Sequence, residues 1–120
     1  MSELEKRLPA AFYATGQGRE PVRHWLRGLD IADRKAIGED IKYLEFAWPV
    51  GMPLCGSLKN GLWEVRSSIS DGRIARIVFC IHEERMVLLH GFVKKTQKTP
   101  ARDLTLALER MKSLKRGENG

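Results

Sequence analysis

The 120-residue sequence has only two cysteines, Cys55 and Cys80, too few for the disulfide framework of a small secreted domain. Its three histidines show no pairwise ligand spacing, and the two cysteines are far apart in the chain, so no metal-binding motif is present. The segment Gly16-Gln17-Gly18 lacks the lysine and the third glycine of a phosphate-binding loop. The sequence therefore predicts a protein without a metal or a bound cofactor.

Long apolar runs are also missing. No stretch approaches the length needed to span a membrane, and residues 1–7 have no apolar segment of the kind found in a secretion signal. The length suits one domain with a single core, and the chain shows no internal repeat and no linker. We therefore expect one domain over residues 1–120, cytoplasmic and with no membrane contact.

Positive charge is abundant, and it is unevenly distributed. The formal net charge is +6, and residues 94–120 hold eight basic side chains against three acidic ones, so five of the six net charges lie there. Residues 19–46, by contrast, hold six of each sign. A charge concentrated at one end favours an anionic partner, whereas a solubilising tail is the simpler alternative.

The first half of the chain predicts a strand and two helices. Residues 8–15 are apolar and aromatic and are followed by a glycine turn, which indicates a strand. Pro21 suits the first position of a helix that includes Trp25. Asp30 is a plausible N-cap for a second helix over residues 31–46, antiparallel to the first. Residues 55–61 are expected to form a loop.

The second half predicts three strands and a final helix. The strands cover residues 62–69, 74–82 and 86–93, and their short connections require antiparallel neighbours. The third strand is apolar on both faces, so we place it centrally, with helices on one face of the sheet. Thr99 as N-cap and Pro100 as first residue begin the last helix. The fold class is a small α+β domain: a twisted antiparallel sheet flanked by an N-terminal helical hairpin and a C-terminal helix.

Two arginines lie inside predicted strands. Arg66 and Arg76 are surrounded by apolar residues, so each must extend to solvent, pair with an acid such as Glu64, or line a charged site. A two-residue turn at Asp71-Gly72 would send the two side chains to opposite faces. A three-residue loop would place them opposite each other on one face. A shared site therefore requires the odd-length loop.

Lysines follow the third strand. Lys94 and Lys95 end it, and alternation sends their side chains to opposite faces if the strand continues. Lys59 and Lys98 are further candidates for phosphate contacts at the rim, and His90 is expected to be a hydrogen-bonded histidine within the sheet. Guanidinium groups hold phosphate bidentately, and a lysine among other cations can act as a base on a ribose 2′-OH. A protein that only binds the nucleic-acid backbone would show the same residues.

Three segments carry a resemblance to a known family. They are Leu62-Trp63-Glu64-Val65-Arg66, Arg76-Ile77-Val78-Phe79 and, most specific, Leu88-Leu89-His90-Gly91-Phe92-Val93-Lys94-Lys95-Thr96-Gln97-Lys98-Thr99-Pro100. Together they resemble the phage-derived, HigB-like branch of the RelE/ParE toxin superfamily, from the first predicted strand to the last helix. The order of predicted elements also agrees with the RelE-like fold.

The resemblance implies the toxin of a type II toxin–antitoxin module. Many members of the HigB and RelE branches are ribosome-dependent endoribonucleases, in which a 2′-OH of the mRNA attacks the adjacent phosphate without a metal. Arg76 matches the strand arginine that contacts the scissile phosphate, and Lys95, with its neighbour Lys94, matches the basic residue after the central strand. Arg66 matches an arginine typical of the branch. The implied partners are the ribosome, mRNA and an antitoxin, commonly of the helix-turn-helix type.

The sequence departs from the RelE pattern in one respect. No tyrosine follows Lys95, where some relatives place a stacking or acid group, so the general acid is not identified. Two other functions stay open: a ParE-like toxin that inhibits gyrase and cuts no RNA, and a non-catalytic nucleic-acid binder.

Overall fold

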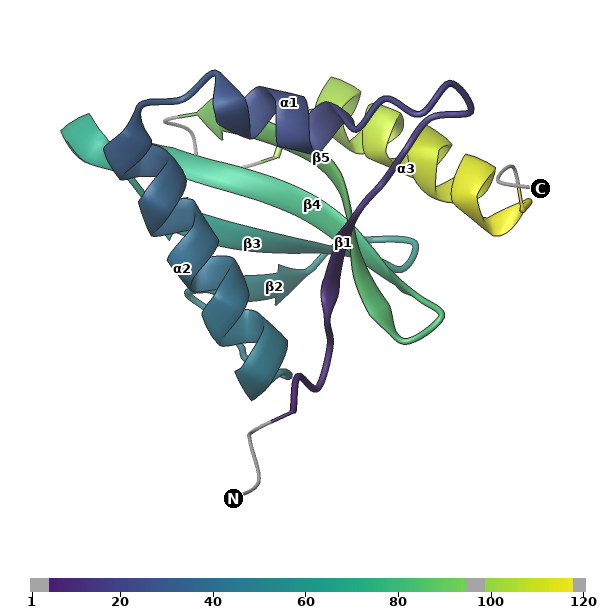
Figure 1. The fold of residues 1–120 in the computed structure, drawn as a ribbon, viewed down its shortest axis with the longest axis horizontal. Helices are drawn as coiled ribbons and strands as arrows, with labels where there is room; N and C mark the ends of the chain where they lie inside the picture. Colours follow the sequence, from purple (N-terminus) through teal and green to yellow (C-terminus); the bar gives the residue numbers. More distant parts are fainter. Residues whose placement is uncertain (1–4, 95–98, 118–120) are drawn as a thin grey trace.

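The computed structural model describes residues 5–94 and 99–117. Over these residues the chain forms a small α+β domain, as the sequence predicts, and its architecture is consistent with a RelE-like fold. In chain order the elements are β1 (Ala10–Phe12), α1 (Pro21–Arg27), α2 (Ile31–Ala47), β2 (Cys55–Ser57), β3 (Leu62–Ser68), β4 (Ile74–His82), β5 (Arg85–Lys94) and α3 (Ala101–Lys115) (Figure 1).

The sheet is mixed rather than purely antiparallel. Its strand order is β1-β5-β4-β3-β2, and β2 to β5 form the predicted antiparallel meander. β1, however, pairs in parallel with β5, with Ala10 opposite Met86 and Phe12 opposite Leu88. A parallel pair needs a long connection, which the chain supplies because α1, α2 and three strands separate β1 from β5. β5 is therefore an interior strand, while β4 occupies the middle of the sheet.

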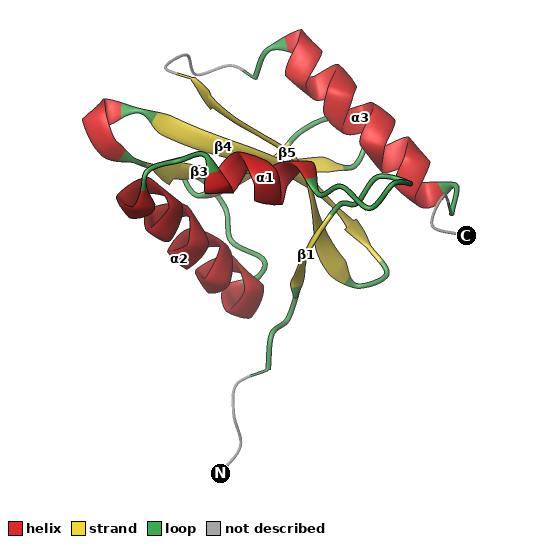
Figure 2. Ribbon diagram, turned by 45° about the horizontal axis from the view of Figure 1, so that its top comes forward, coloured by secondary structure: helices red, strands yellow, loops and turns green. Residues whose placement is uncertain are grey.

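Helices cover both faces of the sheet, so the prediction of a single covered face was wrong. On one face, buried residues of α1 and α2 such as Val22, Ile37 and Leu44 pack against β4 and β5. On the other face, Ala107 and Met111 of α3 pack against Val78 and neighbouring strand residues. Figure 2 shows the strands running between α2 and α3. β5 is apolar on both faces because each of its faces is covered by helices.

Two local predictions near the sheet edges also need correction. Residues 55–57, expected in a loop, form β2 at the edge, with Cys55 opposite Val65. A three-residue Cys-Gly-Ser segment is too short to show the alternation of a strand, and its hydrogen bonding to β3 makes it one. Pro100 takes the N-cap position of α3 that was assigned to Thr99. The Thr99 hydroxyl donates instead to the carboxylate of Glu64 in β3.

The helical hairpin is connected to the turn between β3 and β4 by one buried carboxylate. Asp33 of α2 accepts hydrogen bonds from the backbone N–H of Ser70 at 3.0 Å and from its hydroxyl at 3.1 Å. Arg73 donates to the same carboxylate at 2.8 Å. The Ser70 backbone hydrogen bond is the largest cause that lowers the pKa of Asp33 below its ordinary value. These bonds hold the three-residue turn at Ser70–Gly72, in which Asp71 and Gly72 have positive φ.

α1 lies alongside β5 (Figure 1) and is positioned by a large side chain against a glycine. A Cβ added at Gly91 would lie 2.5 Å from Cε3 of Trp25, so the indole ring occupies the space that any larger residue would need. This contact of Trp25 with Gly91 holds α1 against the sheet.

Within the described residues, none of the helices has both the length and the hydropathy needed to cross a membrane.

Candidate functional site

The two strand arginines pair directly. Arg66 of β3 lies opposite Arg76 of β4, and the turn between the strands is the three-residue Ser70–Gly72. Directly opposed residues of an antiparallel pair project from the same face, so the odd-length loop that a shared site requires is present. Of the two registers that the sequence left open, the structure has the one that pairs Arg66 with Arg76. It places two positive charges side by side, which is unfavourable unless acids or anions compensate them.

Arg76 is compensated from within the protein. Its side chain is fully buried, and its Nη1 lies 3.7 Å from Oε2 of Glu64, itself only 6% exposed. Thr99, just before α3, donates to the same Glu64 oxygen at 2.5 Å and accepts from Arg76 at 3.4 Å. The pairing with Glu64 that the sequence left open is thus the observed one. Arg76 forms part of a buried network that connects β3, β4 and the start of α3.

Arg66 is half-buried and more accessible than Arg76. It lines a hollow of about 510 Å³ that lies beside α2 and the residues leading into β2. Glu39 and Asp40 of α2 line the same hollow, so Arg66 shares it with two carboxylates. These acids lower the attraction of the hollow for an anion, and a phosphate at Arg66 therefore needs additional cations.

The lysines are distributed over both ends of the sheet. Lys94 is the last residue of β5, and its backbone pairs with Ile74, two positions along from the pair of Phe92 and Arg76. Lys59 is exposed in the turn before β3, and Arg66 lies four residues beyond Leu62, the first residue of that strand, a rise of roughly 13 Å along it. The structure therefore does not bring Lys59 to the arginine pair. The other two lysines that the sequence singles out, Lys95 and Lys98, lie outside the described residues.

A histidine–aspartate pair connects β5 with α3 on the face that carries Arg76. His90 Nε2 lies 2.6 Å from Oδ1 of Asp103, and its ring stacks on Phe92 with centroids 5.5 Å apart. Both partners are mostly buried, and within the described residues Oδ2 of Asp103 has no hydrogen-bond partner. His90 is thus the hydrogen-bonded histidine that the sequence predicts. The pair holds the first turns of α3 onto the sheet.

The buried polar groups on this face contact one another: Arg76 pairs with Glu64, Thr99 donates to Glu64, and His90 pairs with Asp103. Such a network orients side chains and fixes α3 but leaves only Arg66 partly open to a ligand. No cluster of three or more metal-ligating side chains is found in the residues that the structure describes. Among the described side chains at this end of the sheet, the guanidinium of Arg66 is the group that could hold an anion.

Sequence reasoning missed two partners of this network, Thr99 and Asp103. Thr99 was interpreted as a helix N-cap because Thr-Pro is typical of a helix start, and nothing in the sequence indicated its hydrogen bond to Glu64. Asp103 lies one helical turn before Ala107, on the buried face of α3, so a carboxylate in an otherwise apolar stripe was the available signal.

Comparison with known proteins agrees with the fold and with the resemblance. The model of the family described as "Phage derived protein Gp49-like (DUF891)" matches residues 24–112, well over half of the chain, from α1 to α3. No curated protein matches the sequence. The matched span contains both strand arginines, the buried network and the end of β5. The chain belongs to the phage-derived Gp49-like family, a family of RelE-like toxins associated with toxin–antitoxin modules.

Proposed function

We propose that this protein is the toxin of a type II toxin–antitoxin module in the HigB-like manner: a ribosome-dependent endoribonuclease that cleaves mRNA and is neutralised by a helix-turn-helix antitoxin. Membership of a toxin family supports the module, and an antitoxin partner follows from it. The observation that carries the nuclease is the pairing of Arg66 with Arg76 at the end of the sheet where β5 terminates in Lys94.

In this proposal the contacts to the scissile phosphate come from Arg66 and from Lys94 or Lys95. A lysine in its neutral form accepts the proton of the ribose 2′-OH, and the 2′-oxygen attacks the adjacent phosphorus to form a 2′,3′-cyclic phosphate as the bond to the 5′-oxygen breaks. The departing 5′-oxygen takes a proton from water and leaves as a 5′-hydroxyl. The guanidinium of Arg66 stabilises the negative charge that develops on phosphorus. Arg76, buried against Glu64, supports Arg66 and the strand end from beneath.

A second candidate function is favoured by one observation. Arg76, which the resemblance matches to the phosphate-contacting arginine, is fully buried and paired with Glu64. A toxin that acts on a protein, such as a ParE-like inhibitor of gyrase, needs no accessible arginine at that position. The same burial is compatible with a protein that binds nucleic acid without cutting it.

Induced expression without an antitoxin separates these functions. The proposal predicts growth arrest and, by primer extension on translated mRNA, breaks that carry a 5′-hydroxyl. Arg66→Ala and Lys95→Ala should each abolish the breaks, whereas Lys42→Ala, which removes the same charge at an exposed position of α2, should not. Arrest without breaks, together with blocked supercoiling by purified gyrase, would establish the gyrase alternative. Full toxicity of both site variants would refute the assignment of the residues.

A further inference from the structure

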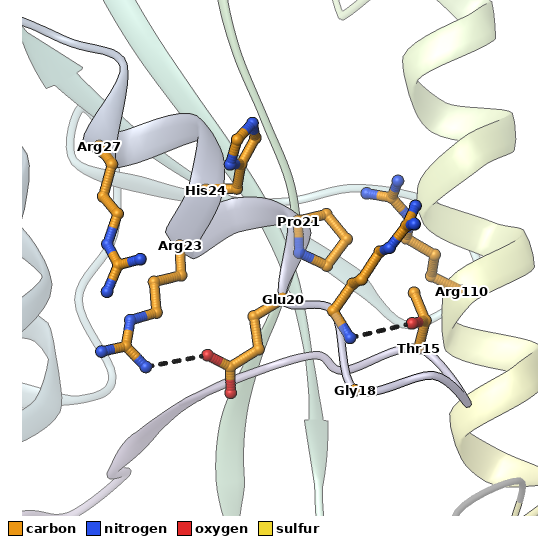
Figure 3. A pocket seen from close by; sticks show the side chains of 9 residues that line it. Thr15, Gly18, Glu20, Pro21, Arg23, His24, Arg27 and Arg110 are labelled. Carbon is orange, nitrogen blue, oxygen red and sulfur yellow. Dashed lines mark hydrogen bonds and ion pairs between the residues drawn. The ribbon is translucent and has the colours of Figure 1, made fainter.

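Four arginines gather between α1 and α3, away from the strand arginines. A pocket of about 730 Å³ there is lined by four arginines, and Glu20 is the single carboxylate of its lining. Figure 3 shows Arg23 and Arg27 on α1, with Arg110 entering from α3 on the other side of the pocket. The fourth arginine, Arg19, comes from the loop that leads into α1.

Three of the arginines recur every four residues along the chain. Arg23 and Arg27 lie on α1 and Arg19 lies on the loop before it, and all three are exposed. On a helix, like charges four residues apart repel each other, as Arg23 and Arg27 do, and the opposite-charge pair of Arg23 with Glu20 at 3.1 Å compensates Arg23 alone. For Arg19, Arg27 and Arg110, no ion pair with a carboxylate occurs within the described part of the chain. An anionic ligand would relieve this repulsion.

The pocket is also preorganised. Thr15 holds the loop before α1, because its side-chain oxygen accepts from the backbone N–H groups of Gln17 and Arg19, and its own N–H donates to the Arg19 carbonyl at 2.8 Å. On the α3 side, Arg110 donates to the carbonyl of Leu89 at 2.7 Å, which fixes its guanidinium at the edge of β5. Partial burial lowers the pKa of Arg110, an environment in which a nearby anion is favourable.

The lining favours phosphate over a protein segment. Protein interfaces bury apolar and aromatic anchors at their centre. Here Pro21 is the one apolar side chain of any size in the lining, and the rest are cationic or polar. Guanidinium groups spaced along one wall, with another facing them, suit consecutive phosphates of a nucleic-acid backbone, which they hold bidentately.

We propose that this pocket, the α1–α3 arginine pocket, binds the phosphate backbone of single-stranded RNA as a site separate from the strand arginines. It takes the backbone without reading base sequence, because arginine contacts to phosphate position a nucleic acid and do not specify it. The inference shares with the proposed function the premise that RNA is the ligand, but it does not depend on cleavage.

The test measures binding of the full-length protein to a short single-stranded RNA with 2′-O-methyl riboses, which cannot undergo 2′-OH attack. The variant is Arg19→Gln/Arg27→Gln, at two exposed positions. The matched control is Lys35→Gln/Lys42→Gln, which removes the same amount of charge at two exposed positions of α2. Fluorescence anisotropy at several salt concentrations between about 50 and 200 mM gives both the affinity and its salt dependence.

We expect the arginine variant to lose roughly tenfold to hundredfold in affinity at about 50 mM salt, and its plot of log affinity against log salt to flatten by about 1.4. The slope change is the sum for two phosphates on a single strand, each worth about 0.7. Arg110→Gln should reduce affinity in the same direction, with circular dichroism confirming that it is folded. The lysine control should change both quantities much less.

Two results would overturn the proposal. The arginine and lysine variants could lose affinity equally, in which case only net charge matters and the pocket is no site. Alternatively, a glutamate-rich peptide of the same charge could bind more tightly than the RNA and be weakened by the arginine variant, which would assign the pocket to an acidic protein segment. Because the RNA probe cannot be cleaved, its binding does not depend on nuclease activity. If the wild-type protein bound this RNA but cut no mRNA, the proposed nuclease function would be refuted and the proposed binding site would stand.

Discussion

Replacing Glu64 by glutamine removes the negative charge beside the buried Arg76 while preserving the volume of the side chain. Arg76 is fully buried, Glu64 is 6% exposed, and their charged atoms lie 3.7 Å apart. The glutamine carbonyl can still accept the hydrogen bond from Thr99, so the substitution isolates the charge. Removing one partner of a buried ion pair costs about 3–5 kcal/mol, and the neighbouring Arg66 adds repulsion of the same sign.

Urea denaturation followed by tryptophan fluorescence measures this loss. With an m-value of about 1.5 kcal/mol/M, the expected midpoint shift is about 2–3 M toward lower urea. The double variant Glu64→Leu/Arg76→Met removes both charges, and it should lie within about 2 kcal/mol of the wild type, because an apolar pair avoids the desolvation of two ions. A loss below about 1 kcal/mol for Glu64→Gln, the range of an exposed pair, would refute the buried network as a source of stability.

Three further predictions concern the elements that position the sheet. Gly91→Ala should destabilise the fold by about 1–3 kcal/mol, since its Cβ overlaps the Trp25 ring, and Trp25→Leu in the same chain should recover part of the loss in thermal melts. Asp33→Asn should lower stability near neutral pH. Because the folded pKa of Asp33 lies below the ordinary 3.8, the difference from wild type should persist above that value and shrink as pH falls below it, as measured by denaturation at about pH 6 and about pH 2.5. Burial raises the pKa of both Cys55 and Cys80 to about 11, so a thiol-reactive disulfide reagent near pH 8 should label the native protein slowly and the denatured protein completely; fast labelling of the native state would contradict their burial.

The sequence narrowed the strand register to two alternatives, because the length of the loop decides it, and the structure has the three-residue loop. Residues 70–72 form a turn with two positive-φ positions, and an odd-length loop determines by itself that Arg66 faces Arg76. The helix starts at Pro21 and after Asp30 were also predictable: proline suits the first helical position, and Asp30 takes the N-cap position, although its side chain makes no capping hydrogen bond. These predictions needed no knowledge of distant residues.

The environment of the candidate site was not predictable in the same way. Whether Arg76 faces solvent or Glu64 depends on where α3 begins and on what Thr99 contacts, and these residues are 23 to 35 positions apart in the chain. The local preference of Thr99 for a helix N-cap competes with a tertiary hydrogen bond, and the tertiary bond prevails because Glu64 would otherwise be buried with less compensation. β2 was likewise not predictable from the sequence, since only its pairing with β3 makes it a strand.

Charge distribution shows the same division. By composition, residues 19–46 are electrically balanced. In the fold, the arginines of α1 point to one pocket and meet Arg110 from α3, more than eighty positions away, while the acids Glu39 and Asp40 line the hollow at Arg66. The net charge counted along the chain therefore gave no sign of this pocket with four arginines in its lining.

The sequence by itself determined the class of fold, the positions of the three long strands and the membership of a toxin family, because periodicity, turn residues and short motifs act over a few neighbouring positions. The tertiary structure decided which cations are available to a ligand. It buried Arg76 against Glu64, left Arg66 half-open among carboxylates, and assembled an arginine pocket from α1 and α3. The physical reason is that burial and ion pairing depend on all the groups within a few ångströms, whichever part of the chain supplies them.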